Sequence, residues 1–139
     1  MPHLSRFIEA QESSYATALA EIKNGRKLTH WIWYIFPQLA GLGRSGTAVF
    51  YGIQNKNEAA EYFDHPLLRK RLIEISDALL HIENKTAHEI FGSPDDLKLR
   101  SCMTLFSLLE NTDPVFQAVL DQYFNGEKDE RTIDLLNQH

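Results

Sequence analysis

The apolar pattern that follows Pro66 constrains the fold of this chain more than any other feature of its sequence. Its members recur at steps of three and four residues, as Leu68, Leu72, Ile75, Leu79 and Ile82. Such spacing puts all of them in one stripe along an α-helix. Pro66 suits the first turn of this helix, because an N–H group there would have no intrahelical partner. An apolar stripe of this length has to pack against other elements, so the neighbouring segments decide the fold class.

Those neighbouring segments carry helix signals rather than strand signals. Ser14, Ser93 and Asp113 each suit an N-cap, and a glycine or an Asn-Gly pair suits several helix ends. Further helices are expected near residues 4–11, 15–24, 57–63, 86–91, 97–109, 115–124 and 129–137. The segment from Thr47 to Ile53 has the most strand-like composition, but it is equally compatible with a helix. The sequence therefore predicts an all-α fold, a single compact domain of six to eight short helices over residues 1–139.

A single apolar core is expected to hold these helices together. A chain of 139 residues buries enough surface to fold without covalent staples. Eight large apolar side chains are expected to share the core: Trp31, Trp33, Phe36, Leu72, Ile75, Met103, Phe106 and Leu120. The one cysteine, Cys102, excludes a disulfide framework and a multi-thiolate metal site, and is expected to be buried. The histidines show no ligand spacing either, so we expect no metal and no cofactor.

The net charge argues against nucleic acid as a partner. The formal charge is −5 at pH 7, which gives no general attraction to a phosphate backbone, although a local basic cluster can still bind one phosphate. The longest apolar run, Trp31 to Phe36, is too short to span a bilayer, and the first residues lack the regions of a signal peptide. We therefore expect a cytoplasmic protein that binds neither duplex nucleic acid nor membrane. The sequence indicates no oligomeric state.

Residues 26–52 concentrate the unusual chemistry of the chain. Both tryptophans and four of the seven glycines lie in this segment, so it is either a packing nucleus or a site. Basic residues precede the aromatic run and Gln38 follows it. The stretch from Gly41 to Thr47 looks like a flexible loop that leads into a helix, where backbone N–H groups can hold a phosphate. In the packing interpretation, the glycines only relieve crowding and Ser45 only caps the helix.

The site interpretation assigns roles to particular residues. Eight are expected to bind the ligand: Arg26, Lys27, Trp31, Tyr34, Gln38, Arg44, Ser45 and Lys98. His30 could act as an acid or base, because histidine is the side chain suited to proton transfer at neutral pH, unless it is a hydrogen-bonded core residue. Glu58 or Asp96 could stabilise a cationic centre during glycosidic hydrolysis, although Asp96 also suits a helix start. We expect six side chains of this segment to converge around one cavity with Trp31 or Tyr34 as its wall, namely Arg26, Lys27, His30, Gln38, Arg44 and Ser45.

The segment also carries a family resemblance. The string is Gly25-Arg26-Lys27-x-x-His30-Trp31-x-Trp33-Tyr34-Ile35-Phe36-Pro37-Gln38-Leu39, followed by Gly41-Leu42-Gly43 and Tyr51-Gly52-Ile53. Later matches include His65-Pro66-x-Leu68, Ile90-Phe91-Gly92 and Asp96-x-Lys98-x-x-Ser101-x-Met103-Thr104-Leu105-Phe106. Over essentially its whole length the chain resembles the bacterial family catalogued as domain of unknown function 1810. The resemblance implies a compact helical fold and a polar pocket, but no established activity.

Two further names are attached to this resemblance. Members of the family are sometimes labelled calpastatin-like, but calpain inhibitors are long disordered repeats, whereas this chain has the composition of a packed domain. A more distant similarity is to small helical hydrolases that act on ADP-ribose derivatives. The corresponding segments here are His30 to Phe36 and Lys98 to Phe106. The chain departs from those hydrolases in lacking their Glu-His-Tyr start and their Trp-Gly-Asp-like closing segment.

Two functions of different class follow from these observations. The first is a binding or hydrolytic site for a phosphorylated, nucleotide-like small molecule such as an ADP-ribose or NAD derivative. The alternative is a non-catalytic interaction module that uses an aromatic groove to hold a partner protein. A converging cluster of Arg26, His30, Gln38 and Ser45 would favour the first, and a large exposed apolar patch would favour the second. The sequence does not decide whether the chain is an enzyme.

Overall fold

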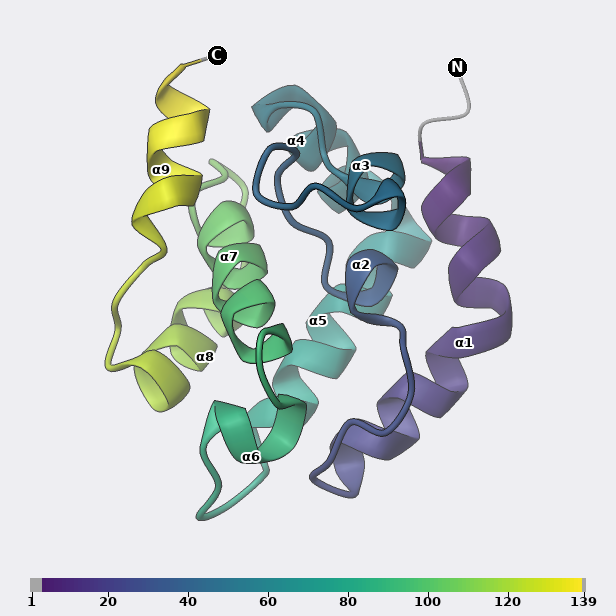
Figure 1. Cartoon of the computed structure of the whole chain (residues 1–139), viewed down its shortest axis with the longest axis vertical. Helices are drawn as coiled ribbons and strands as arrows, with labels where there is room; N and C mark the ends of the chain where they lie inside the picture. Colours follow the sequence, from purple (N-terminus) through teal and green to yellow (C-terminus); the bar gives the residue numbers. More distant parts are fainter. Residues whose placement is uncertain (1–3, 139) are drawn as a thin grey trace.

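Helices follow one another along the computed structural model, which describes residues 4–138 (Figure 1). Within these residues there are nine helices and no strand. The all-α prediction is therefore confirmed, but the number of helices exceeds the expected six to eight. Their bounds are α1 Ser5–Lys23, α2 Ile32–Ile35, α3 Gly46–Tyr51, α4 Lys56–Asp64, α5 Pro66–Leu80, α6 Ala87–Phe91, α7 Asp95–Ser107, α8 Pro114–Phe124 and α9 Glu130–Asn137.

The number differs because short helices form in segments that carry no clear helix signal. The aromatic run contains α2, a helix of four residues, and the strand-like segment after Ser45 folds as α3, a helix of six residues. In the opposite direction, the two helices expected before Gly25 are one continuous helix, α1. Ser14 lies inside α1 and its hydroxyl is 3.1 Å from the Tyr34 hydroxyl, so the predicted cap at Ser14 is wrong. A serine inside a helix can bond outward instead of capping when a tertiary partner is available.

Most of the other predicted helix ends are confirmed by their hydrogen bonds. Asp113 accepts from the Val115 N–H at the start of α8, and Pro114 follows it. Asn125 ends α8 in the left-handed conformation, with a φ of 55°, as expected for a helix C-terminus. Ser93 is the exception, because α7 begins at Asp95 without any side-chain cap.

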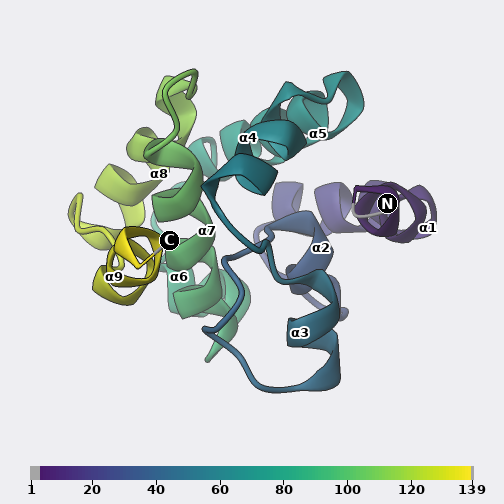
Figure 2. The same cartoon turned by 90° about the horizontal axis from the view of Figure 1, so that it is seen from above.

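The helices pack around α5, which crosses the middle of the molecule in Figure 1. α1 and α8 both pack against α5, and α7 packs in turn against α8. The short helices α2 and α3 lie together on one side of the molecule, as the view from above shows (Figure 2). α2 contacts both α1 and α7, and α9 contacts α7. As a result, α2 of the aromatic segment connects α1, in the first half of the chain, with α7, in the second half.

The expected core is confirmed for seven of its eight side chains. Trp31, Phe36, Leu72, Ile75, Met103, Phe106 and Leu120 belong to one buried cluster. Trp33 packs against the cluster but is only partly buried. Cys102 is buried as predicted, and burial raises the pKa of its thiol well above the usual value. Within residues 4–138, none of the helices combines the length and hydrophobicity that crossing a membrane requires.

Two close backbone contacts fix the loop between α2 and α3. Leu39 and Ile53 form an isolated parallel bridge, in which the Ala40 N–H donates to the Ile53 carbonyl at 2.7 Å. The approach requires glycine at position 52, because a Cβ atom there would lie 2.9 Å from the Cα of Ala40. Gly43 is similarly tight, since its Cβ would lie 2.8 Å from the side chain of Ala48. These contacts hold the loop that carries Arg44 against the rest of the fold.

Candidate functional site

A surface hollow of about 450 Å³ lies where this loop meets the first turns of α7 and α9. It falls within the usual volume of small-molecule sites, roughly 300–1,000 Å³. Its polar side chains are Gln38, Arg44, Ser45, Lys98, Ser101, Asp129 and Arg131. Its apolar residues include Trp33, Leu42, Ala48, Pro94 and Leu97. We refer to this group of residues as the cationic hollow.

Three separate parts of the chain build the cationic hollow. From α7 and the residue before it come Pro94, Leu97, Lys98 and Ser101, which recur at steps of three and four and so share one helix face. The loop before α3 contributes Arg44 and Ser45. The start of α9 contributes Arg131, one residue inside that helix. Side chains from such distant segments meet here because α9 packs on α7, and because α2 packs on both α3 and α7.

Positive charge dominates the cationic hollow. Arg44, Lys98 and Arg131 border it, against one acid, Asp129. One carboxylate oxygen of Asp129 accepts hydrogen bonds from the Ser101 hydroxyl at 3.2 Å, the Thr132 N–H at 3.0 Å and the Thr132 hydroxyl at 2.6 Å. Asp129 is therefore the N-cap of α9. Among residues 4–138, neither Arg44 nor Arg131 forms an ion pair. Two of the three cations thus have no acid of their own.

Lys98 is held beside an aromatic ring. Its Nζ atom lies 4.7 Å from the centroid of the Trp33 ring, a cation–π distance. The same Nζ is 3.5 Å from one carboxylate oxygen of Asp95. The other oxygen of Asp95 binds Nζ of Lys27 at 2.8 Å, and the Lys27 side chain is almost fully buried. Asp95 therefore shares its charge between two lysines, of which only Lys98 lines the hollow.

The structure brings together only part of the site expected from the sequence. Gln38, Arg44, Ser45 and Lys98 line the cationic hollow, but Ser45 also caps α3 through the Ala48 N–H at 3.1 Å. The remaining expected residues do not line it: Arg26, Lys27, His30, Trp31, Tyr34, Glu58 and Asp96. This hollow therefore includes Arg44 but neither Arg26 nor His30 of the expected cluster. The aromatic wall is Trp33 instead of Trp31 or Tyr34.

A buried acid, Glu21, was not predicted from the sequence, and its contacts explain why Trp31 lies outside the hollow. Glu21 accepts from the Leu28 and Thr29 N–H groups, from the Thr29 hydroxyl and from the Trp31 indole at 2.9 Å. Burial alone raises the pKa of Glu21, but these hydrogen bonds outweigh it and lower the pKa from 4.5 to about 2. Trp31 thus anchors the loop after α1. The sequence signal for this buried acid is that Glu21 stands next to Ile22, on the face of α1 that is buried.

The three proposed catalytic residues have different partners. Glu58 receives two hydrogen bonds from Arg6, at 3.2 and 3.3 Å, and joins α1 to the start of α4. Asp96 lies 3.6 Å from the His88 ring. His30 is exposed, and its carbonyl accepts from the Tyr34 hydroxyl at 3.4 Å. None of these contacts joins two of the proposed catalytic groups to each other.

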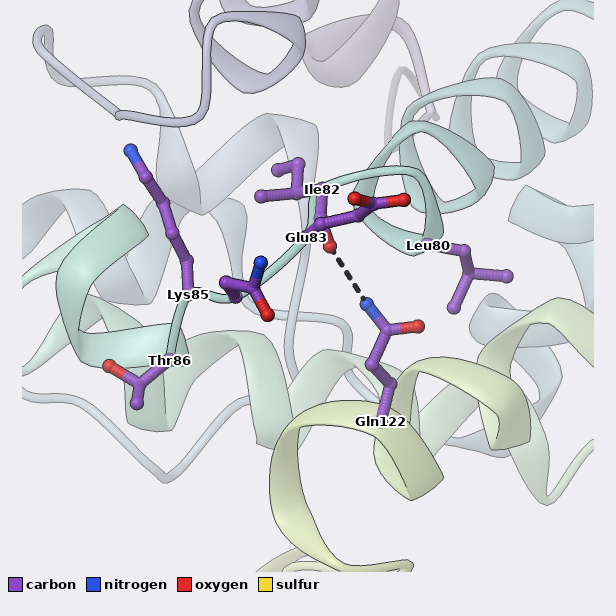
Figure 3. Close-up of a pocket in the computed structure, with 7 residues that line it drawn as sticks. Leu80, Ile82, Glu83, Lys85, Thr86 and Gln122 are labelled. Carbon is purple, nitrogen blue, oxygen red and sulfur yellow. Dashed lines mark hydrogen bonds between the residues drawn. The ribbon is translucent and has the colours of Figure 1, made fainter.

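A second hollow, of about 520 Å³, lies at the turn between α5 and α6 (Figure 3). Gln122 of α8 closes one side and donates to the Ile82 carbonyl at 3.3 Å. The hollow has one acid, Glu83, and one base, Lys85. The Lys85 ammonium donates to the Gly25 carbonyl at 3.0 Å. The two charges of this hollow balance, and its lysine already donates a hydrogen bond within the protein. It therefore attracts a charged ligand less strongly than the cationic hollow does.

Comparison with known proteins identifies the family. A family model described as a protein of unknown function, DUF1810, matches residues 1–136. The chain belongs to the DUF1810 family. The resemblance noted from the His-Trp-x-Trp-Tyr-x-Phe-Pro-Gln string is therefore confirmed. No curated protein matches the sequence.

A solved structure extends the DUF1810 assignment to the fold. The conserved hypothetical protein Rv1873 from Mycobacterium tuberculosis is 45% identical, with a TM-score of 0.94 over 96% of each chain. Neither the name of this protein nor the description of the DUF1810 family assigns an activity or a ligand. The distant similarity to hydrolases of ADP-ribose derivatives finds no support in these comparisons. Any function of this DUF1810 member has to be argued from its own site.

Proposed function

We propose that the cationic hollow binds a small phosphorylated molecule. The observation that carries the proposal is the charge of the site. Arg44, Lys98 and Arg131 border one hollow whose single acid, Asp129, is already the cap of α9. Like charges gathered in one place repel one another, and an anion relieves that repulsion. Arginine in particular matches the geometry of a phosphate, because it donates two parallel N–H bonds.

Neutral polar groups suit the same ligand. The Gln38 amide and the Ser45 hydroxyl border the hollow beside Arg44, and both can donate hydrogen bonds to phosphate oxygens. Lys98 adds an ammonium that is partly buried, with 24% of its side chain exposed. A lysine that is partly shielded from water attracts an anion more strongly than a fully solvated one does. Nucleotide-like compounds, including ADP-ribose and NAD derivatives, are members of this ligand class.

The proposal is for binding rather than for hydrolysis. His30, Glu58 and Asp96 do not line the cationic hollow, and the carboxylates of Glu58 and Asp96 each have another partner. The acid that does line it, Asp129, accepts three hydrogen bonds. These hydrogen bonds hold Asp129 in place as the N-cap of α9, which gives it a structural role. A large aromatic groove for a partner protein is also less well supported, because Trp31 is buried.

A thermal-shift screen tests the proposal. Phosphate, nucleotides and ADP-ribose should each be added to the wild type and to the Arg44→Ala and Arg26→Ala variants. A ligand at 100 times its dissociation constant stabilises the folded state by about 2.7 kcal/mol. We expect at least one of these anions to raise Tm of the wild type and of Arg26→Ala, but not of Arg44→Ala. Arg26 is the matched control, because it is an exposed arginine outside the hollow.

Two outcomes would contradict the proposal. One is that none of these anions, phosphate included, stabilises the wild type at millimolar concentration. The other is that Arg26→Ala removes the effect while Arg44→Ala retains it, which would return the site to the loop after α1. Unfolding of the Arg44→Ala protein would be seen in its circular dichroism, and Arg131→Ala then provides the same comparison from α9.

A further inference from the structure

We infer that the ligand of the cationic hollow is a phosphate ester of an aromatic or heteroaromatic group rather than inorganic phosphate. This inference rests on the proposed function and specifies its ligand. The observation behind it is that the cations share the hollow with an apolar wall. Trp33 of α2, Leu42 of the loop, and Pro94 and Leu97 of the α7 region all line it. Inorganic phosphate has no apolar surface that could pack against such a wall.

Leu97 is the clearest part of this wall. The helix α7 buries most of its apolar side chains, including Leu99 and Met103, completely. Leu97 instead leaves 56% of its surface exposed, on the same helix face as Lys98 and Ser101. A single exposed leucine is common on protein surfaces. Here it lies in a hollow beside Trp33, where a ligand ring can cover it.

The distance between charge and ring connects the two halves of the site. Nζ of Lys98 is 4.7 Å from the centroid of the Trp33 ring. A phosphate that contacts Lys98 therefore lies next to this aromatic ring and to Leu97, the neighbour of Lys98 in sequence. The substituent of a phosphate ester bound in this way meets the apolar wall. Rings pack well on such walls, because their flat faces fit between an aromatic and an aliphatic side chain.

A small molecule fits these observations better than a protein surface does. The volume of about 450 Å³ suits one ring system with its phosphate. Within residues 4–138, three other large apolar side chains are strongly exposed, namely Leu28, Val49 and Phe50. None of them lines the cationic hollow. The apolar surface that accompanies the charges is therefore the wall inside the hollow.

Isothermal titration calorimetry with two probes tests the inference. The probes are inorganic phosphate and 1-naphthyl phosphate, titrated into the full chain at the same ionic strength. We expect 1-naphthyl phosphate to bind at least tenfold more tightly. The Leu97→Ala variant should lose roughly tenfold in affinity for 1-naphthyl phosphate and keep its affinity for inorganic phosphate. Leu28→Ala is the matched control, because Leu28 is an exposed leucine outside the hollow.

The outcomes separate the inference from the proposed function. If both probes bind equally, or if Leu97→Ala and Leu28→Ala behave alike, the inference is wrong and the anion site stands. If neither probe binds to the wild type, the inference is wrong, and the proposed function fails as well if the nucleotides and ADP-ribose of the thermal-shift screen also have no effect. If 1-naphthol binds as tightly as its phosphate and Arg44→Ala has no effect, the hollow recognises apolar rings without an anion, and both fail.

Discussion

Replacing Glu21 by glutamine should destabilise the fold in a manner that depends on pH. Glu21 is 8% exposed and its carboxylate accepts four hydrogen bonds from the segment after α1. Glutamine has nearly the same shape but keeps only one acceptor oxygen and no charge. Its NH₂ group takes the place of the carboxylate oxygen that accepts from the Thr29 hydroxyl, and its one oxygen carries less negative charge for the three donors that remain. The substitution therefore removes the charge that anchors Trp31 and the loop before α2.

The magnitude follows from the pKa of Glu21. Burial raises this pKa, but the four hydrogen bonds lower it by more than burial raises it, so that it changes from 4.5 to about 2. Each pH unit of difference between the folded and unfolded pKa is equivalent to about 1.4 kcal/mol, which gives roughly 3 kcal/mol. Because the folded pKa is the lower one, this stability is present above the unfolded value of 4.5. It is lost as the pH falls from there towards 2.

Urea denaturation at a series of pH values measures this effect. We expect Glu21→Gln to lower the free energy of unfolding by roughly 2–3 kcal/mol at pH 7. At pH 3 the difference from wild type should be less than half of that. Glu12→Gln is the matched control, because Glu12 is an exposed acid on the same helix. Its effect should stay within about 0.5 kcal/mol at every pH.

A loss that is the same at pH 3 and pH 7 would refute this reasoning. Such a result would mean that glutamine disturbs packing and that the charge of Glu21 contributes nothing. A loss below about 0.5 kcal/mol at pH 7, as for an ordinary surface position, would show that the four hydrogen bonds do not anchor the loop.

Two further predictions concern the core and metal ions. Phe106 is fully buried and its ring lies 5.4 Å from Tyr62 and 5.8 Å from Phe116, so Phe106→Ala should cost roughly 3–5 kcal/mol in urea denaturation. The exposed Phe50 provides the control, and equal losses for Phe50→Ala and Phe106→Ala would contradict the packing argument. Among residues 4–138, no group of three or more His, Cys, Asp or Glu side chains is arranged to hold a metal ion. Dialysis against a chelator is therefore predicted to leave Tm unchanged, and a drop of many degrees that a divalent ion reverses would overturn this prediction.

Much of the fold could be predicted, because its helix boundaries depend on local chemistry. Pro66, Pro114 and Asn125 mark helix ends by backbone properties that act within one turn. Serine is less decisive, because the same side chain can cap a helix or bond outward from its middle. Ser14 does the second, and only its partner Tyr34, distant in sequence, determines that choice. The very short α2 has too few residues to show a periodic pattern.

The site was harder to predict, because its halves come from distant parts of the chain. Gln38, Arg44 and Ser45 could be proposed from one continuous polar and glycine-rich stretch. Arg131 belongs to a charge cluster that looks like ordinary solvated surface, and only the packing of α9 on α7 brings it to the hollow. The position of Lys27 before the aromatic run predicts that it belongs to the site. Its ammonium instead pairs with Asp95, an acid from the other half of the chain.

The central claim, that an anion binds in the cationic hollow, is tested most directly by nuclear magnetic resonance. Uniformly ¹⁵N-labelled protein would be titrated with 1-naphthyl phosphate and with inorganic phosphate while backbone amide shifts are recorded. We predict saturable shift changes concentrated in residues 42–48, 97–101 and 129–132, the segments that build the hollow. Changes centred on residues 26–31, on the neighbourhood of Glu58 or on the hollow of Figure 3 would contradict the account, as would the absence of any saturable change.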